Sequence, residues 1–232
     1  MSIMKNLMKT AFLAVLPALL FTACNRDDDP VLTQTASVNV VHASPNAPGV
    51  DLLVDNTRVN TSPLVYPNNT GYLEVPAGAR NIKVNAAGTS TSVIDANVTL
   101  EADRYYSVFA ANTLASIEPV VVMDDLTTPA ANRAHVRFIH LSPDAPAVDV
   151  AVVNGPVLFS NSTFKQATPF SPVAVGTYNL EVRLAGTNTV VLSLPNVQLA
   201  NGQIYTVFAK GFVNPPAGNQ NALSAGLIVN ND

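Results

Sequence analysis

The chain carries twice a group of residues that could form a nucleophilic site. Each group holds a histidine, a serine followed by proline, and an aspartate, at the same internal spacing. A histidine can take the proton of a serine while a carboxylate orients the histidine, so these residue types could serve a hydrolase. The proline, however, offers no backbone N–H to an oxyanion. The two groups are His42, Ser44, Pro45 and Asp51, and His140, Ser142, Pro143 and Asp149.

The same residues also describe a turn between two strands. Proline presets its own φ, and the following Asn46 or Asp144 can bond to the backbone, so Ser-Pro-Asn/Asp opens a turn. Pro48 and Pro146 precede the next strand, where a missing donor is harmless. We expect the histidine to hydrogen-bond this turn and the aspartate to help hold it. This interpretation predicts no catalytic residue, and the hydrolase stays as the alternative.

Metal binding is the third chemistry that these residues could perform. His42 with Asp51, or Asp144 with Asp149, offers nitrogen and oxygen ligands. Calcium loops carry closely spaced Asp residues, and zinc sites gather several His or Cys side chains. The sequence has neither pattern, and we predict no metal and no cofactor.

Both groups lie in a duplicated segment. His42 and His140 are 98 residues apart, and the same offset relates Gly78 to Gly176. Between residues 93 and 97 the offset slips by one residue, after which Asn97 matches Asn196. A repeat of about 100 residues has the size of a domain.

Each copy has the pattern of an all-β domain. Polar and apolar residues alternate in segments such as 82–84 and 180–183, and turn-forming residues separate these segments. About seven short strands in each copy predict two tandem β-sandwich domains, and the immunoglobulin-like and transthyretin-like topologies both remain open. The strands expected in the first copy are Ser37–His42, Val50–Asp55, Gly71–Val75, Asn81–Ala86, Ser92–Leu100, Tyr105–Ala110 and Glu118–Met123.

The N-terminal residues have the pattern of a bacterial export signal. Lys5 and Lys9 precede an apolar run, residues 11–21, that is shorter than the roughly 20 residues of a membrane-spanning helix. The run ends in Leu-Phe-Thr-Ala-Cys24, which resembles the lipobox of bacterial lipoproteins. Cys24 is the only cysteine in the chain. We therefore expect a lipid at Cys24 to anchor the protein in the membrane.

The residues after Cys24 predict the final location. The segment Asn-Arg-Asp-Asp-Asp-Pro, residues 25–30, resembles the signal that sends Bacteroidetes lipoproteins to the outer face of the outer membrane. We expect the protein to face the cell exterior, with the periplasmic face as the alternative. The expected organisation is a lipoprotein signal peptide at 1–23, an acidic tether at 24–35, β-sandwich domains at 36–126 and 134–232, and a linker at 127–133.

Composition narrows the range of partners. The chain has 12 basic and 16 acidic residues and a net charge of −4, without the basic patch that nucleic acid requires. It has no tryptophan, so stacking on a glycan would fall to Tyr66, Tyr72 or Phe170. The loop at 213–221 departs most from its counterpart in the first copy and is a candidate binding loop.

The repeated motif resembles a known family. The pattern His-x-Ser-Pro-(Asn/Asp)-Ala-Pro-x-Val-Asp is similar to that of domain-of-unknown-function family 4397, which occurs in bacterial exported proteins, often in tandem. The resemblance implies a fold and a context but no activity. We expect a lipid-anchored binding, adhesion or envelope-assembly protein without catalysis, whose partner is a protein or a glycan. A hydrolase and a glycan-binding accessory protein are the alternatives.

Overall fold

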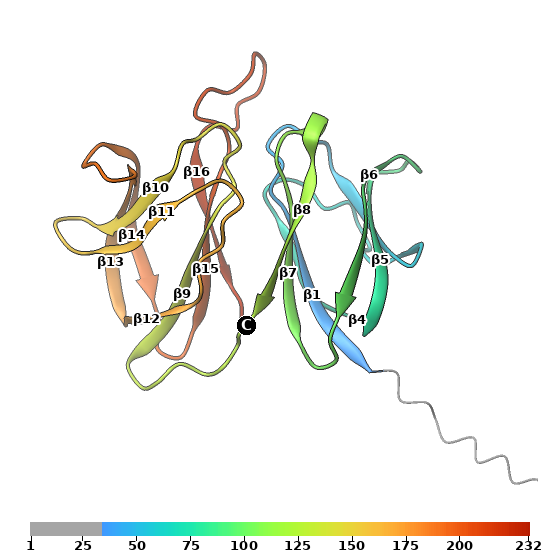
Figure 1. Ribbon diagram of the computed structural model, residues 1–232, viewed down its shortest axis with the longest axis horizontal. Coiled ribbons are helices and arrows are strands. Elements are labelled where there is room, and N and C mark those ends of the chain that lie inside the picture. The colour runs from blue at the N-terminus through green and yellow to red at the C-terminus, as the bar shows by residue number, and fades with distance from the viewer. Residues whose placement is uncertain (1–33) are drawn as a thin grey trace, which may run out of the picture. The chain divides into compact units, whose positions relative to one another are not determined.

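The computed structural model describes residues 34–232 (Figure 1). The predicted signal peptide, Cys24 and the charged signal at 25–30 lie outside the described residues, as does all but the end of the tether. Within residues 34–232 no helix has the length and apolar character needed to cross a membrane.

Each copy folds into a sandwich of two four-stranded sheets, which confirms the predicted all-β class. The sheets have the orders β4-β1-β7-β8 and β3-β2-β5-β6 in the first copy, and β12-β9-β15-β16 and β11-β10-β13-β14 in the second. The elements are β1 (Thr35–His42), β2 (Val50–Val54), β3 (Thr57–Arg58), β4 (Asn69–Pro76), β5 (Gly78–Ala86), β6 (Ser92–Leu100), β7 (Tyr105–Ala111), the 3-10 helix η1 (Leu114–Ser116), β8 (Glu118–Asp124), β9 (Arg133–His140), β10 (Val148–Val152), β11 (Val157–Ser162), β12 (Ser171–Ala174), β13 (Gly176–Leu184), β14 (Val190–Leu199), β15 (Ile204–Lys210) and β16 (Ser224–Val229).

The strand order is the same in both copies and distinguishes between the two predicted topologies. β1 pairs with β7, and β9 with β15, in parallel, while the remaining ladders are antiparallel. In an immunoglobulin constant domain the first two strands share a sheet. Here β1 and β2 lie in different sheets, so the transthyretin-like alternative remains. The seven strands expected in the first copy are present, and the sequence missed the two-residue strand β3.

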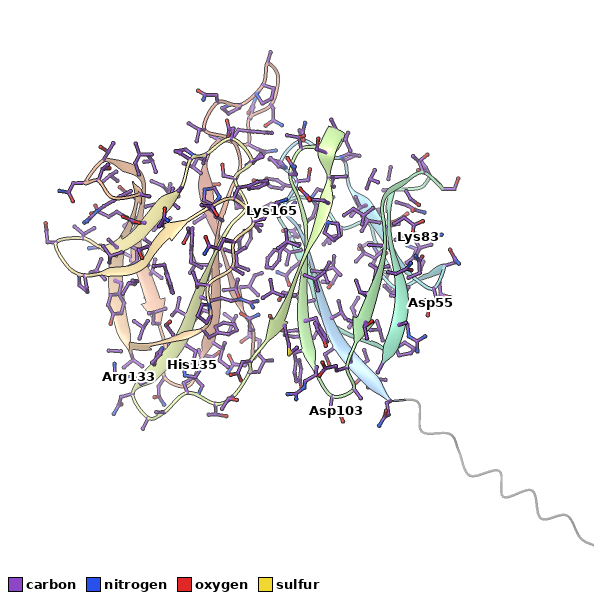
Figure 2. The ribbon with its side chains drawn as sticks, viewed as in Figure 1. Asp55, Lys83, Asp103, Arg133, His135 and Lys165 are labelled. Carbon is purple, nitrogen blue, oxygen red and sulfur yellow. The ribbon has the colours of Figure 1, made fainter. Side chains whose placement is uncertain are left out.

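The central strands of the inner sheet, which faces the other copy, are β1 and β7 or β9 and β15, and they are mostly buried on both faces. Along β1, Val38 and Val40 point into the core of their own sandwich, whereas Val41 packs against the other copy. In β9, Phe138 likewise points into the core of its own sandwich, and Ile139 packs against the other copy. Strands covered on both sides read as nearly continuous apolar runs, and outer strands such as β14 alternate between half-buried and exposed positions. Charged side chains such as Lys83 and Asp55 lie on the outer sheet and its loops (Figure 2).

An apolar cluster joins the two sandwiches. Phe109 of β7 and Phe208 of β15 meet with their ring centroids 6.0 Å apart. The glycine at position 226 leaves room for the Phe208 ring, because a Cβ there would collide with it. The buried members of the cluster are Val41, Ala43, Phe109, Ala111, Ile139, Leu141, Phe208 and Ile228.

A buried polar network lies beside this cluster. Arg137 and Asp124 form an ion pair of 2.7 Å whose side chains are 1% and 0% exposed. Arg137 also donates hydrogen bonds to Thr206 (2.8 Å) and Ser107 (3.1 Å). Asp124 accepts from the Ser107 hydroxyl (2.7 Å) and from the Tyr72 hydroxyl (2.6 Å). We call Tyr72, Ser107, Asp124, Arg137, Thr206 and Asn230 the interdomain network.

The interdomain network occupies matching positions of the two copies but carries different charges. Strand pairing matches Asp124 to Asn230, because each follows the residue that pairs with Tyr106 or Tyr205. The offset of 98 matches Arg137 to the buried Asn39. The first copy therefore supplies the negative charge of the pair, and the second copy supplies the positive charge.

Removing one member of this ion pair should destabilise the protein strongly. We expect Asp124→Asn to lower the free energy of unfolding by about 3–5 kcal/mol, because it leaves the buried Arg137 guanidinium without a counter-charge. Denaturant unfolding followed by circular dichroism measures the loss.

Two further variants make this test specific. Asp124→Asn combined with Arg137→Met removes both charges and should lose less than Asp124→Asn alone. Glu118→Gln breaks the half-exposed pair in which Lys165 reaches the first sandwich (3.0 Å, Figure 2) and should cost less than about 1 kcal/mol. Equal losses for Asp124→Asn and Glu118→Gln would contradict the importance of burial.

Candidate functional site

The two motif histidines close the turn that follows β1 or β9. His42 and His140 are fully buried. The Nε2 atom of His42 lies 2.8 Å from the carbonyl oxygen of Pro48, and that of His140 lies 3.0 Å from the carbonyl oxygen of Pro146. Because a carbonyl can only accept, Nε2 carries the proton and donates it. Each histidine thus bridges its turn, as the sequence predicted.

Burial sets the protonation of these histidines. It lowers the pKa of both imidazoles below 6.5, and the hydrogen bond to the proline carbonyl opposes this shift more weakly. A neutral imidazole with its proton on Nε2 satisfies the turn carbonyl without placing a charge in the interior. The edges of Tyr66 and Phe164 complete the two pockets.

The motif aspartates fasten a different turn. One carboxylate oxygen of Asp51 accepts from the backbone N–H of Gly88, and Asp149 accepts from Gly186, both at 2.9 Å. These glycines have φ values of +72° and +71°, a conformation that glycine adopts without strain. The second oxygen pairs with Arg58 (2.7 Å) in the first copy.

In the second copy, the second oxygen of Asp149 accepts instead from the backbone N–H of Asn161 (2.7 Å). Each aspartate therefore ties its own strand, β2 or β10, to the loop that holds Gly88 or Gly186 and to the neighbouring strand, β3 or β11. Three of these four contacts use the carboxylate as an acceptor from backbone N–H groups and the fourth is the pair with Arg58, so the charge has a structural use.

The motif serines differ between the copies. Ser142 donates a hydrogen bond of 2.6 Å to the carbonyl oxygen of Gly211, and both Ser142 and Ser44 are fully buried. The Ser44 hydroxyl has no hydrogen-bond partner within the described residues. In residues 34–232, no hydrogen bond joins a motif histidine to its serine or aspartate. The three side chains do not form the relay that a triad requires.

The residue after each Ser-Pro reaches a distant segment. Asn46 accepts from the backbone N–H of Leu114 at 2.8 Å. Asp144 accepts from the N–H groups of Val213 and Asn214, both at 2.8 Å. The sequence interpretation had expected these side chains to bond within their own turn. They instead hold the loop after β7 or β15.

The candidate glycan-stacking aromatics make intramolecular contacts. Tyr72 belongs to the interdomain network, where burial first and the adjacent carboxylate second raise its pKa. The Phe170 ring lies under the Arg137 guanidinium, 4.5 Å from ring centroid to Cζ. Tyr66 packs between the His42 ring and the ammonium of Lys210, and burial raises the pKa of Tyr66 to about 12.

The candidate binding loop at 213–221 also contacts the rest of the molecule. The side-chain amides of Asn219 and Asn221 donate to the carbonyl oxygen of Pro45, at 2.9 Å and 2.6 Å. The loop of the second copy therefore rests on the motif turn of the first. The loop that departs from the duplicated pattern is thus one of the contacts between the two sandwiches.

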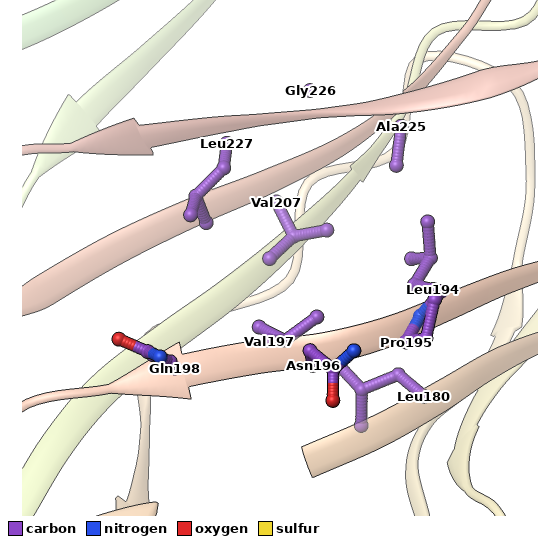
Figure 3. Close-up of a pocket in the computed structure, with 10 residues that line it drawn as sticks. All are labelled: Leu180, Leu194, Pro195, Asn196, Val197, Gln198, Val207, Ala225, Gly226 and Leu227. Atoms are coloured by element: carbon purple, nitrogen blue, oxygen red, sulfur yellow. The ribbon is translucent and has the colours of Figure 1, made fainter. Parts of the chain in front are cut away.

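A pocket lies at the open side of the second sandwich, between the edge strands β14 and β16 (Figure 3). Its volume is about 430 Å³. Apolar side chains form most of its wall, and the only polar side chains are the amides of Asn196 and Gln198. The lining residues are Leu180, Leu194, Pro195, Asn196, Val197, Gln198, Val207, Ala225, Gly226 and Leu227.

The same place in the first sandwich is closed. β6 and β8 are the counterparts of β14 and β16, and their Cα atoms approach within 8 Å. The space between them is about 10 Å³. The strand pairing shows where the two copies differ. In the first copy Asn97 pairs with Asn81, whereas in the second copy both Pro195 and Asn196 lie opposite Asn179. The one-residue slip seen in the sequence is a β-bulge in the edge strand that borders the pocket.

Another hollow, a groove of about 340 Å³, lies in the first sandwich. Amides and hydroxyls of residues 60–70 line it together with apolar side chains such as Val59 and Leu73. Several of these groups, including Asn60 and Thr70, already bond to the backbone. Within residues 34–232, no three His, Cys, Asp or Glu side chains lie close enough together to hold a metal ion.

Fold and contacts together define a tandem β-sandwich protein whose repeated motif fastens turns and loops. The chain belongs to the family described as Domain of unknown function (DUF4397), which matches residues 36–151 and 151–231. The junction of the two matches falls inside β10, whereas strand equivalence divides the copies between β8 and β9. No curated protein matches the chain.

The two serines provide a matched pair for testing the motif. We expect Ser142→Ala to lower the free energy of unfolding by about 1 kcal/mol, because it removes the hydrogen bond to Gly211. Ser44→Ala should be neutral or stabilising, since its hydroxyl has no partner to lose. Urea unfolding of both variants measures the difference, and equal losses would contradict the asymmetry.

The histidines predict a loss of stability in mild acid. Their pKa values in the folded protein lie below 6.5, so the unfolded chain binds more protons as the pH falls beneath that value. The free energy of unfolding should therefore be highest above pH 6.5 and decrease as the pH falls below that value. Unfolding titrations at several pH values measure this slope, and the double variant His42→Gln/His140→Gln should flatten it. An unchanged slope would show that other groups cause it.

Proposed function

We propose that this protein is a lipid-anchored component of the bacterial outer membrane that works by binding or assembly and not by catalysis. The observation that carries the proposal is the use of the repeated His-Ser-Asp set. In both copies the histidine and aspartate hold turns through backbone carbonyl and amide groups. A set that is duplicated and used for fastening supports a scaffold more than it supports two hydrolytic centres.

The joined sandwiches support a binding role. Edge strands and loops on a rigid frame are ordinary places for recognition. The buried interdomain network and apolar cluster hold both copies in one compact unit. A partner would thus meet one preorganised body, which reduces the ordering cost of binding.

Anchoring and location rest on the N-terminal residues. The lipobox-like end of the apolar run supports acylation at Cys24, and the basic-then-acidic segment after it favours the outer face of the membrane. The periplasmic face is the alternative location, and there an envelope-assembly partner becomes the better proposal.

Acyl labelling combined with protease treatment tests this proposal. In cells fed a labelled fatty acid, the wild-type protein should take up label and sediment with membranes, and Cys24→Ser should do neither, because the chain has no other cysteine. Thr33→Ser keeps both the cysteine and residues 25–30 and should behave as the wild type does. Wild-type protein should be digested on intact cells.

The opposite results have clear meanings. Label in Cys24→Ser would contradict anchoring at this residue. Protection of the wild type until the cells are lysed would contradict surface exposure and place the protein in the periplasm. Hydrolysis of a substrate that is lost in folded Ser142→Ala would contradict the non-catalytic role.

A further inference from the structure

We propose that the pocket between β14 and β16 is a binding site for a small, uncharged ligand with an apolar body. The inference rests on the proposed function, a body that binds without catalysis, and adds the site and the class of ligand. Its volume of about 430 Å³ falls in the usual range of small-molecule sites, about 300–1,000 Å³.

The lining determines the chemistry of the ligand. No ionisable side chain lines the pocket, in a protein whose overall charge is −4. A charged ligand would lose its hydration there without gaining a counter-charge. The apolar wall, which includes the buried Leu180 and Val207, suits hydrocarbon. Asn196 and Gln198 can hydrogen-bond one neutral polar group of the ligand.

The first sandwich is an internal comparison for this pocket. Pairing partners match Leu194 to Ala96, and Leu227 to Val121. At both positions the second copy has the larger side chain, which would by itself fill space. The pocket is nevertheless about 430 Å³ in the second copy and about 10 Å³ in the first. Two other lining residues, Ala225 and Gly226, are smaller than their counterparts Pro119 and Val120, so the path of the edge strand opens the pocket together with these two smaller residues.

The bulge that redirects this strand is held by its own hydrogen bond. Asn196 has a φ of +58°, a left-handed conformation that asparagine tolerates better than other residues with a Cβ. Its backbone N–H donates to the side-chain oxygen of Asn179 at 3.0 Å. Bulges of this kind occur at sheet edges and beside binding sites, where they change the direction of side chains.

The same bulge disfavours an added β-strand as the occupant. Pro195 has no backbone N–H to donate, and the bulge interrupts the regular spacing of edge groups. An extended peptide could not form a continuous ladder along β14 across this point. A small ligand needs no ladder, and we therefore assign the pocket to a small molecule.

Binding of the uncharged probe N-phenyl-1-naphthylamine tests the site. The full chain carrying Cys24→Ser should bind one equivalent saturably, with enhanced probe fluorescence. Because the chain has no tryptophan, Leu227→Trp introduces a single reporter at the pocket. Val121→Trp is its matched control, since these positions are 50% and 41% exposed. The probe should quench Leu227→Trp more strongly than Val121→Trp.

Closing the pocket should remove the binding. Deletion of Pro195 restores the residue count of the first copy and should weaken probe affinity at least about tenfold. Ala225→Leu narrows the pocket without changing the backbone and should act in the same direction if the deletion does not fold. Pro119→Leu changes the matching position of the first copy and should leave affinity unchanged.

Three results would overturn the assignment. They are the absence of saturable binding, equal affinity in the folded Pro195 deletion or Ala225→Leu protein, and displacement of the probe by an apolar extended peptide that pairs with the sheet edge. Because the probe is measured on Cys24→Ser, failure of acylation leaves this test unaffected. Loss of probe binding likewise leaves the anchoring proposal untouched.

Discussion

The buried pair of Arg137 and Asp124 constrains the described part of the chain more than any other contact. Each side chain comes from a different sandwich, and each is almost completely withdrawn from water. Burying a charge costs several kcal/mol unless a partner and hydrogen bonds compensate for it. Ser107, Thr206 and Tyr72 provide those bonds. The two sandwiches must therefore pack in the arrangement that brings Arg137 and Asp124 together, and the same arrangement buries the apolar cluster.

The unequal charges also explain why the two copies fit each other. A duplicated domain could in principle pair with another copy of itself, because its inner sheet offers the same apolar positions. The matching positions of the pair are Asn39 and Asn230. Pairing of two first copies would bury Asp124 without a guanidinium. Complementary charges thus favour the first copy beside the second.

Duplication allowed the two copies to take on different tasks within one frame. The histidine bridge and the aspartate fastening are retained in both. The Ser-Pro turn of the first copy additionally receives the loop at 213–221. The second copy alone carries the bulge and the open side between β14 and β16. Apart from the buried charges of Arg137 and Asp124, these differences lie in loops and edge strands, where the shared cores do not restrict them.

The sequence by itself determined the duplication, the all-β class and the strands of the first copy other than β3. These follow from local periodicity and turn residues, which do not depend on distant contacts. It also located the slip near residue 195 and the turn role of the histidines. The sequence analysis did not single out Arg137, whose charge lies between the apolar residues Val136 and Phe138 of β9.

Only the tertiary structure decided the remaining features, because they depend on which distant segments meet. Strand order separated the two sandwich topologies, and the packing of inner sheets paired Arg137 with Asp124. The same packing brought Tyr72 and Phe170 into contact with the members of this buried pair. The extra residue of the second copy could have lengthened a loop without changing the sheets. Its position in an edge strand facing β16 made it the border of a pocket.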